Sequence, residues 1–180
     1  MPDLEVLENP KTNLASEIFT SDRKTLAKYY FNDNRTPVTF DELPTHLVDA
    51  LIATEDIRFY SHSGIDFKRT FGAALKFGKD GGGSTITQQL AKLLFTGEGS
   101  KDIIERLTQK YKEYIIAVIL ERNYTKEEII TQYLNLYDFG NNGDGIRSAA
   151  RIYFGKEPID LEINESAILV GMLKNSSLYN

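Results

Sequence analysis

Residues 83–92 read Gly-Ser-Thr-Ile-Thr-Gln-Gln-Leu-Ala-Lys, and this stretch decides how the whole chain is interpreted. Glycines also occupy positions 81 and 82, so a turn or hinge leads into it. Thr85 and Gln88 have the spacing of a capping box, which predicts that a helix begins there. Apolar residues at i, i+4, i+7 and i+8 predict one buried stripe on this helix, made of Ile86, Leu90, Leu93 and Leu94.

The start of this predicted helix has the features of a phosphate-binding site. Backbone N–H groups at a helix N-terminus attract anions, and Gln88, Gln89 and Lys92 lie off the apolar stripe. A capped surface helix without a ligand explains the same residues equally well. The residues of this stretch alone leave both interpretations open.

Four other segments bear on this choice, and with residues 83–92 they follow one another in a recognisable order. They are residues 54–64 (Thr-Glu-Asp-Ile-Arg-Phe-Tyr-Ser-His-Ser-Gly), 110–113 (Lys-Tyr-Lys-Glu), 126–135 and 149–156. The five segments resemble the five signature motifs of the peptidoglycan glycosyltransferases, which polymerise lipid II. This family comprises the glycosyltransferase domains of class A penicillin-binding proteins and their monofunctional relatives.

The fold expected from the sequence is mainly α with a short N-terminal β element. Strand-like stretches at 17–20 and 26–30, with a turn between them, predict a β-hairpin. Helical spacing and caps predict further helices, over about 44–54, 102–122, 125–137, 145–153 and 162–172. We divide the chain into an N-terminal linker and β-hairpin region (1–40) and a glycosyltransferase domain (41–180). The resemblance implies a lysozyme-like helical lobe and a smaller membrane-proximal lobe.

The composition fits one globular domain and excludes several classes of function. The chain has 180 residues, enough for a sizeable core. Its net charge of −5 argues against a nucleic-acid-binding protein, which would carry a basic face. There is no cysteine, which excludes a disulfide framework, a thiol nucleophile and a thiolate zinc site.

The resemblance also implies a location. Members of the family are anchored in the bacterial cell membrane by an N-terminal helix and act on its extracytoplasmic face. No segment of this sequence reaches the ~18–20 apolar residues that span a bilayer. We therefore expect the sequence to be part of a longer protein, in which a transpeptidase domain can follow.

Glu55 is the leading candidate for a catalytic base. It lies at the end of the helix predicted over 44–54, where the helix dipole disfavours a negative charge. A solvated acid at a helix end is the plainer interpretation of this position. The resemblance implies instead that Glu55 activates the 4-hydroxyl of the acceptor sugar. It also implies that Asp56 orients loops or cations beside Glu55.

A second acid, Glu113, shares one predicted helical face with Arg106 and Lys110. By spacing alone, a salt-bridged face in solvent is the plainer interpretation. The resemblance implies that Glu113 is a second catalytic residue and that Lys110 lies beside it, where pyrophosphate departs. Gln109 replaces the arginine that the family usually has before this lysine. Neutralisation of the phosphates is therefore expected to depend on other cations, namely Lys92, Lys110, Lys112 or Arg106.

The resemblance assigns substrate binding to a larger set of residues, which comprises Asp56, Ser84, Thr85, Gln88, Gln89, Lys92, Lys110, Lys112 and Asn135. It requires no cofactor and no protein-bound metal. A divalent cation at the pyrophosphate site is an open alternative.

Residues 67–79 form a basic amphipathic stretch. Phe67, Phe71 and Leu75 share a helical face, and no acid occurs between Asp66 and Asp80. An ordinary core helix explains the apolar spacing. On an acidic protein, however, such a stretch favours contact with a membrane surface, with Lys68, Arg69, Lys76 and Lys79 meeting the headgroups.

The expected function is the polymerisation of lipid II into glycan strands. The resemblance implies that the 4-hydroxyl of lipid II attacks the anomeric carbon of the growing lipid-linked strand, with inversion and loss of undecaprenyl pyrophosphate. The alternative is a lysozyme-like muramidase or lytic transglycosylase, which has no pyrophosphate to hold. A third interpretation is a non-catalytic wall- or membrane-binding module, in which Glu55 or Glu113 would be expected to be missing.

Overall fold

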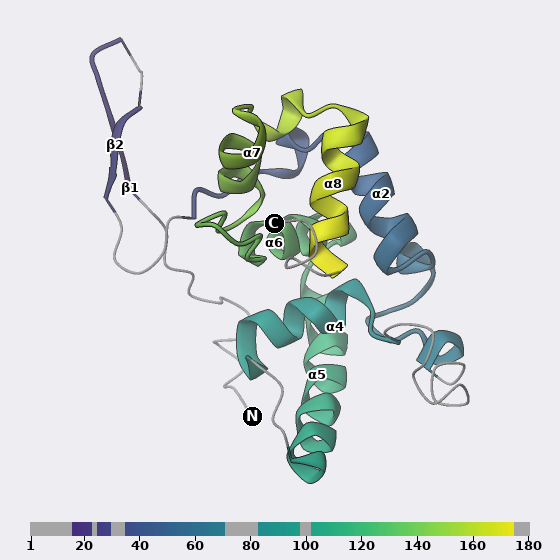
Figure 1. The fold of residues 1–180 in the computed structure, drawn as a ribbon. Coiled ribbons are helices and arrows are strands. Elements are labelled where there is room, and N and C mark those ends of the chain that lie inside the picture. The colour runs from purple at the N-terminus through teal and green to yellow at the C-terminus, as the bar shows by residue number, and fades with distance from the viewer. Residues whose placement is uncertain (1–15, 23–24, 30–34, 71–82, 98–101, 175–180) are drawn as a thin grey trace. The chain divides into compact units, whose positions relative to one another are not determined.

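The computed structural model describes residues 16–22, 25–29, 35–70, 83–97 and 102–174 (Figure 1). The contacts divide the chain into two compact units. Of the described residues, unit 1 contains those within 51–133, and unit 2 contains those within 16–50 and 134–174. The described residues are mainly helical, which confirms the predicted fold class. The predicted domain boundary between residues 40 and 41 stays a prediction.

The short β element is the predicted hairpin (Figure 1). Strand β1 (Ser16–Phe19) pairs antiparallel with β2 (Thr25–Tyr29), and Ser16 lies opposite Tyr29. The register shifts between Ile18 and Phe19, so the ladder contains a bulge. The turn between the strands begins at the predicted position.

Unit 2 is built from short helices around an apolar core. They are η1 (Phe40–Glu42), the first part of α2 (Thr45–Glu55), the end of α6 (Lys126–Leu136), α7 (Ile146–Phe154), η4 (Pro158–Asp160) and α8 (Ile163–Lys174). Leu47, Phe139, Ile146 and Leu169 have no exposed surface. Gly155 ends α7 in the left-handed conformation, with φ of +66°, as the sequence predicts.

Unit 1 is organised around the long helix α5 (Ile103–Asn123), against which α4 (Ile86–Ala91) packs. Asp102 caps α5, and Thr125 with Glu128 forms the predicted capping box at the start of α6. The fully buried residues of unit 1 include Leu51, Phe59, Ile86, Leu90, Ile116, Leu120 and Ile129.

The predicted apolar stripe after Thr85 is only half correct. Ile86 and Leu90 are fully buried, but Leu93 is 40% exposed. The reason is that α4 gives way at Lys92 to a π-helical turn, η3 (Lys92–Thr96). A π turn contains more residues than an α turn, so the side chains beyond it rotate away from the original stripe.

None of the helices in the described part of the chain is both long and apolar enough to cross a membrane.

Candidate active site

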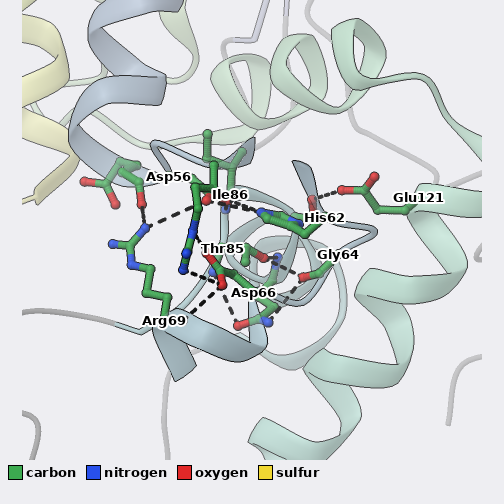
Figure 2. Close-up of polar contacts among 12 residues, drawn as sticks. Asp56, His62, Gly64, Asp66, Arg69, Thr85, Ile86 and Glu121 are labelled. Carbon is green, nitrogen blue, oxygen red and sulfur yellow. Dashed lines mark hydrogen bonds and ion pairs between the residues drawn. The ribbon is translucent and has the colours of Figure 1, made fainter. Parts of the chain in front are cut away.

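The carboxylate of Asp56 lies among several polar partners in unit 1 (Figure 2). Asp56 follows α2 directly and has no exposed surface. Its Oδ2 accepts hydrogen bonds from His62 Nε2 at 3.0 Å and from the backbone N–H of Ile86 at 3.1 Å. Arg69 Nη1 lies 3.9 Å from Oδ1 and also donates to the carbonyl of Glu55. This position favours a structural role for Asp56 over the predicted substrate contact.

Two side chains at the start of α4 form hydrogen bonds with the backbone of Gly64. Thr85 Oγ1 donates to the carbonyl oxygen of Gly64 at 2.7 Å, and Gln88 Nε2 donates to the same oxygen at 3.2 Å. The backbone N–H of Gln88 in turn donates to Thr85 Oγ1 at 3.1 Å, which confirms the predicted capping box. Thr85 and Gln88 are both fully buried, so their polar groups serve this junction. Their predicted role in binding substrate stays a prediction.

Two N–H groups at the start of α4 already have partners within the protein. Those of Ile86 and Gln88 are bound by the side chains of Asp56 and Thr85. A phosphate site at this helix start stays a prediction. The negative charge at this helix start is the carboxylate of Asp56, which the helix dipole stabilises. No local pattern predicts this contact, because Asp56 and Ile86 are 30 positions apart.

Glu55 keeps its side chain partly exposed at the end of α2. One of its oxygens, Oε2, accepts a hydrogen bond from Gln89 Nε2 at 2.8 Å. The amide oxygen of Gln89 accepts from the hydroxyl of Tyr133 at 3.0 Å. The structure therefore joins two predicted site residues, Glu55 and Gln89, and adds Tyr133, for which the sequence analysis proposed no role.

Lys110, Ser84 and Glu113 form a second polar cluster. Lys110 Nζ donates to Ser84 Oγ at 2.6 Å and to Glu113 Oε2 at 2.8 Å. Glu113 is 7% exposed, and its other oxygen lies 3.5 Å from the Thr96 hydroxyl. Burial and the negative charge of Glu113 together raise the pKa of the neighbouring Tyr114. The cluster thus presents one partly exposed ammonium group, which a buried carboxylate holds in place.

Comparison with known proteins decides which family has this arrangement. The family model described as Transglycosylase matches residues 22–180. This chain belongs to the transglycosylase family. The family expected from the five motifs is therefore confirmed.

Several penicillin-binding proteins are similar to this transglycosylase chain. Penicillin-binding protein 1A of Escherichia coli strain K12 is 37% identical over 185 residues, covering 100% of this chain and 21% of that protein. Penicillin-binding protein 1F of Bacillus subtilis strain 168 is 43% identical over 154 residues, covering 83% of this chain and 21% of that protein. Penicillin-binding protein 1A of Aquifex aeolicus strain VF5 is 36% identical and covers 100% of this chain and 24% of its own length. The chain spans about a fifth to a quarter of the length of these relatives.

A lysine of the fourth motif stabilises the first motif of this transglycosylase chain. Lys126 Nζ donates to the carbonyl of His62 at 2.8 Å and pairs with Glu121 at 2.7 Å. It also lies 4.2 Å from the ring centroid of Phe59, a cation–π distance. The carboxylate of Glu121, labelled in Figure 2, also accepts a hydrogen bond from the hydroxyl of Thr87, so residues of motifs two and four meet at this carboxylate. In the sequence, Lys126 stands out only as the first residue of motif four, and that position does not predict these contacts.

The remaining predicted binding residues lie apart from these clusters. Lys92 and Lys112 are exposed, and neither forms an ion pair within the described part of the chain. Lys112 does not share a helical face with Lys110, since residues i and i+2 point to different sides. In unit 2, Asn135 uses both ends of its amide on Val38: Nδ2 donates to the carbonyl and Oδ1 accepts from the N–H, each at 2.9 Å. This pairing favours a structural role for Asn135.

The predicted membrane stretch is described only over residues 67–70. Phe67 is 75% exposed and Lys68 is exposed, as expected for a surface segment. Arg69 differs from the prediction, because its guanidinium is directed at Glu55 and Asp56. Residues 71–79 lie outside the described residues.

A metal site does not emerge from the described residues, because they contain no group of three or more His, Asp or Glu arranged to hold an ion. A divalent cation at the pyrophosphate site stays a prediction.

Proposed function

We propose that this chain is a peptidoglycan glycosyltransferase domain that polymerises lipid II. The observation that carries the proposal is the environment of Glu55. It is a partly exposed carboxylate with one oxygen held by Gln89, and a hydrogen-bonded base of this kind can accept a proton from a substrate hydroxyl. The transglycosylase family and the relatives named penicillin-binding proteins support the same reaction.

The proposed reaction is a single inverting displacement. Glu55 takes the proton from the 4-hydroxyl of the acceptor lipid II, and that oxygen bonds to the anomeric carbon of the donor strand. The bond between this carbon and the pyrophosphate oxygen breaks, and the electron pair leaves with undecaprenyl pyrophosphate. The ammonium group of Lys110 stabilises the negative charge that develops on the departing phosphates.

The Lys110 cluster also favours glycosyl transfer over the alternative of a hydrolase or lytic enzyme. A muramidase or lytic transglycosylase cleaves a sugar–sugar bond and releases no phosphate. A fixed cation held by a buried carboxylate is useful to an enzyme whose leaving group is a pyrophosphate. The donor is therefore expected to be lipid-linked, and the enzyme to act at the extracytoplasmic face of the bacterial cell membrane.

A lipid-linked substrate requires the enzyme to approach a bilayer. Besides Phe67 of the predicted membrane stretch, unit 1 has another exposed apolar surface that can contact the bilayer. The first part of α5 exposes four large apolar side chains, which are Ile103, Ile104, Leu107 and Tyr111. Each is at least 67% exposed. We include this surface with Phe67 in the proposed contact with the membrane, since apolar side chains beside cations bind lipid interfaces.

The decisive experiment incubates the full chain with purified lipid II in detergent micelles. Gel electrophoresis should resolve glycan polymers, and undecaprenyl pyrophosphate should be released. Glu55→Gln should lower the rate by roughly 10²–10⁴-fold. Glu127→Gln, which changes an exposed acid of α6, is the matched control and should leave the rate unchanged. If the wild-type protein instead shortens preformed glycan strands, the hydrolase alternative is correct.

A further inference from the structure

The amide of Gln89 connects Glu55 to a buried tyrosine on another helix. Gln89 Nε2 donates to Glu55 Oε2 at 2.8 Å, and Gln89 Oε1 accepts from the Tyr133 hydroxyl at 3.0 Å. The three residues come from α4, the end of α2 and α6, and all belong to unit 1. We call these three side chains the Gln89 bridge.

The direction of both hydrogen bonds follows from the chemistry of the groups. An ionised carboxylate only accepts hydrogen bonds, so an amide that faces Glu55 must present its NH₂ group. The amide oxygen of Gln89 then faces Tyr133, where it needs a donor. The hydroxyl proton of Tyr133 is that donor, so this tyrosine determines which way the amide points.

Tyr133 is suited to fix an orientation because it is itself fixed. It has no exposed surface and is the largest of the fully buried side chains of the described residues. A close-packed interior leaves such a ring little freedom to move. Gln89 is only partly buried, and without the tyrosine hydroxyl its amide is free to rotate about its terminal bond.

We propose that Tyr133 is a positioning residue for the general base. Through Gln89 it holds Oε2 of Glu55, which leaves the other oxygen, Oε1, for the acceptor hydroxyl. This inference rests on the proposed role of Glu55. Proton transfer depends steeply on the placement of the base, so losing the hydroxyl slows the chemical step and not substrate binding.

The test is a double-mutant cycle between Tyr133→Phe and Gln89→Met in the full chain, with lipid II as substrate. Phenylalanine keeps the ring and removes only the hydroxyl. Tyr133→Phe should lower kcat by about 10-fold, as for one buried hydrogen bond, with little change in KM. Because both substitutions break the same bridge, the double variant should be no slower than Gln89→Met alone.

Tyr137→Phe is the matched control, because it also removes a tyrosine hydroxyl that donates to a protein acceptor, the carbonyl of Leu173 at 2.8 Å. Its kcat should equal that of the wild type. The inference is overturned if Tyr133→Phe and Tyr137→Phe have the same effect on kcat, or if the effects of Tyr133→Phe and Gln89→Met multiply. A packing role for Tyr133 produces those outcomes.

A second measurement tests the bridge without turnover, so that it stays distinguishable from a failure of the proposed function. The side-chain NH₂ protons of Gln89 can be assigned by NMR from their absence in Gln89→Met. Their chemical shifts should change in Tyr133→Phe and in Glu55→Gln but not in Tyr137→Phe. Unchanged shifts in Tyr133→Phe overturn the inference whether or not the wild type polymerises lipid II.

Discussion

The buried carboxylate of Asp56 accepts a hydrogen bond from the backbone N–H of Ile86 at 3.1 Å, although the two residues lie 30 positions apart. The first residue of α4 is thereby fixed to the residue that follows Glu55. Asp56 therefore holds the start of α4, the helix that carries Gln89, next to Glu55, the acid that Gln89 binds. The geometry around Glu55 depends on a residue that does not itself reach the surface.

Replacing Asp56 should unfold the protein more easily. Asp56→Ala leaves His62 and the N–H of Ile86 without their buried acceptor, and each buried donor left unpaired lowers the free energy of unfolding by about 1–3 kcal/mol. Urea denaturation followed by circular dichroism measures this loss. Asp49→Ala, at an exposed position of α2, is the control and should change stability by less than about 0.5 kcal/mol. Equal stability of the two variants, with a raised KM for Asp56→Ala, would instead support the predicted contact of Asp56 with the substrate.

Gly64 should tolerate no side chain. Its φ is +90°, and a Cβ atom there would lie 2.8 Å from the backbone of Ala117 on α5. Gly155 also has a positive φ, of +66°, but a Cβ there would meet no atom of the described residues within 4 Å. Both alanine substitutions strain the backbone, and only Gly64→Ala adds a clash. The free energy of unfolding should therefore fall by roughly 1–3 kcal/mol more for Gly64→Ala than for Gly155→Ala, as measured by urea denaturation.

The parts of the fold that the sequence predicted correctly have local causes. Asp102, Thr125 with Glu128, and Gly155 act within one turn of the helix end that they mark, so their spacing alone was sufficient. The π turn at Lys92 was not predicted, because the leucines at 90, 93 and 94 are equally compatible with a continuous α-helix and with a π turn. This is why the exposure of Leu93 was not foreseen.

The sequence predicted which residues belong to the candidate site, but not how these residues contact one another. Motif resemblance identified Glu55, Gln89 and Lys110, but the partners of these groups are distant in sequence. Ser84 contacts Lys110 across 26 positions, and Tyr133 contacts Gln89 across 44. Long-range contacts of this kind depend on how the helices pack, which no local pattern encodes.

The stability of the protein should depend on pH through Asp66. Burial opposes its ionisation, but the N–H of Arg69 and the guanidinium of Arg58 outweigh this, so the pKa of Asp66 lies below its ordinary value of 3.8. A carboxyl with a lowered pKa in the folded state stabilises the fold fully above pH of about 4. This contribution is lost as the pH falls through the folded-state pKa.

Asp66→Asn removes that contribution at every pH. The difference in free energy of unfolding between wild type and Asp66→Asn should therefore be largest near neutral pH and should shrink below pH of about 4. Urea titrations of both proteins at several pH values measure it. A difference that is independent of pH would mean that the Arg58 contact at 2.7 Å does not stabilise the ionised form of Asp66.

Lys110 and Lys112 should differ in their effect on catalysis, although both are cations of motif three. Lys110 lies between Ser84 and Glu113, whereas Lys112 is exposed on another side of α5. Lys110→Met should lower kcat/KM for lipid II by roughly 10- to 100-fold, the effect of losing a charge-assisted contact to phosphate. Lys112→Met should change it by less than about twofold. Polymerisation rates at several lipid II concentrations give both values.

Lys110→Met also leaves the buried carboxylate of Glu113 without its cation, so a loss of activity by itself does not separate binding from folding. The combined variant Lys110→Met with Glu113→Gln removes that unpaired charge and should recover most of the lost stability. If the ammonium group acts on the departing pyrophosphate, activity should stay low in this stable double variant. Recovery of near wild-type polymerisation would instead mean that Lys110 serves only to neutralise Glu113, and that the phosphates are bound by other cations, of which exposed Lys92 is the first to test.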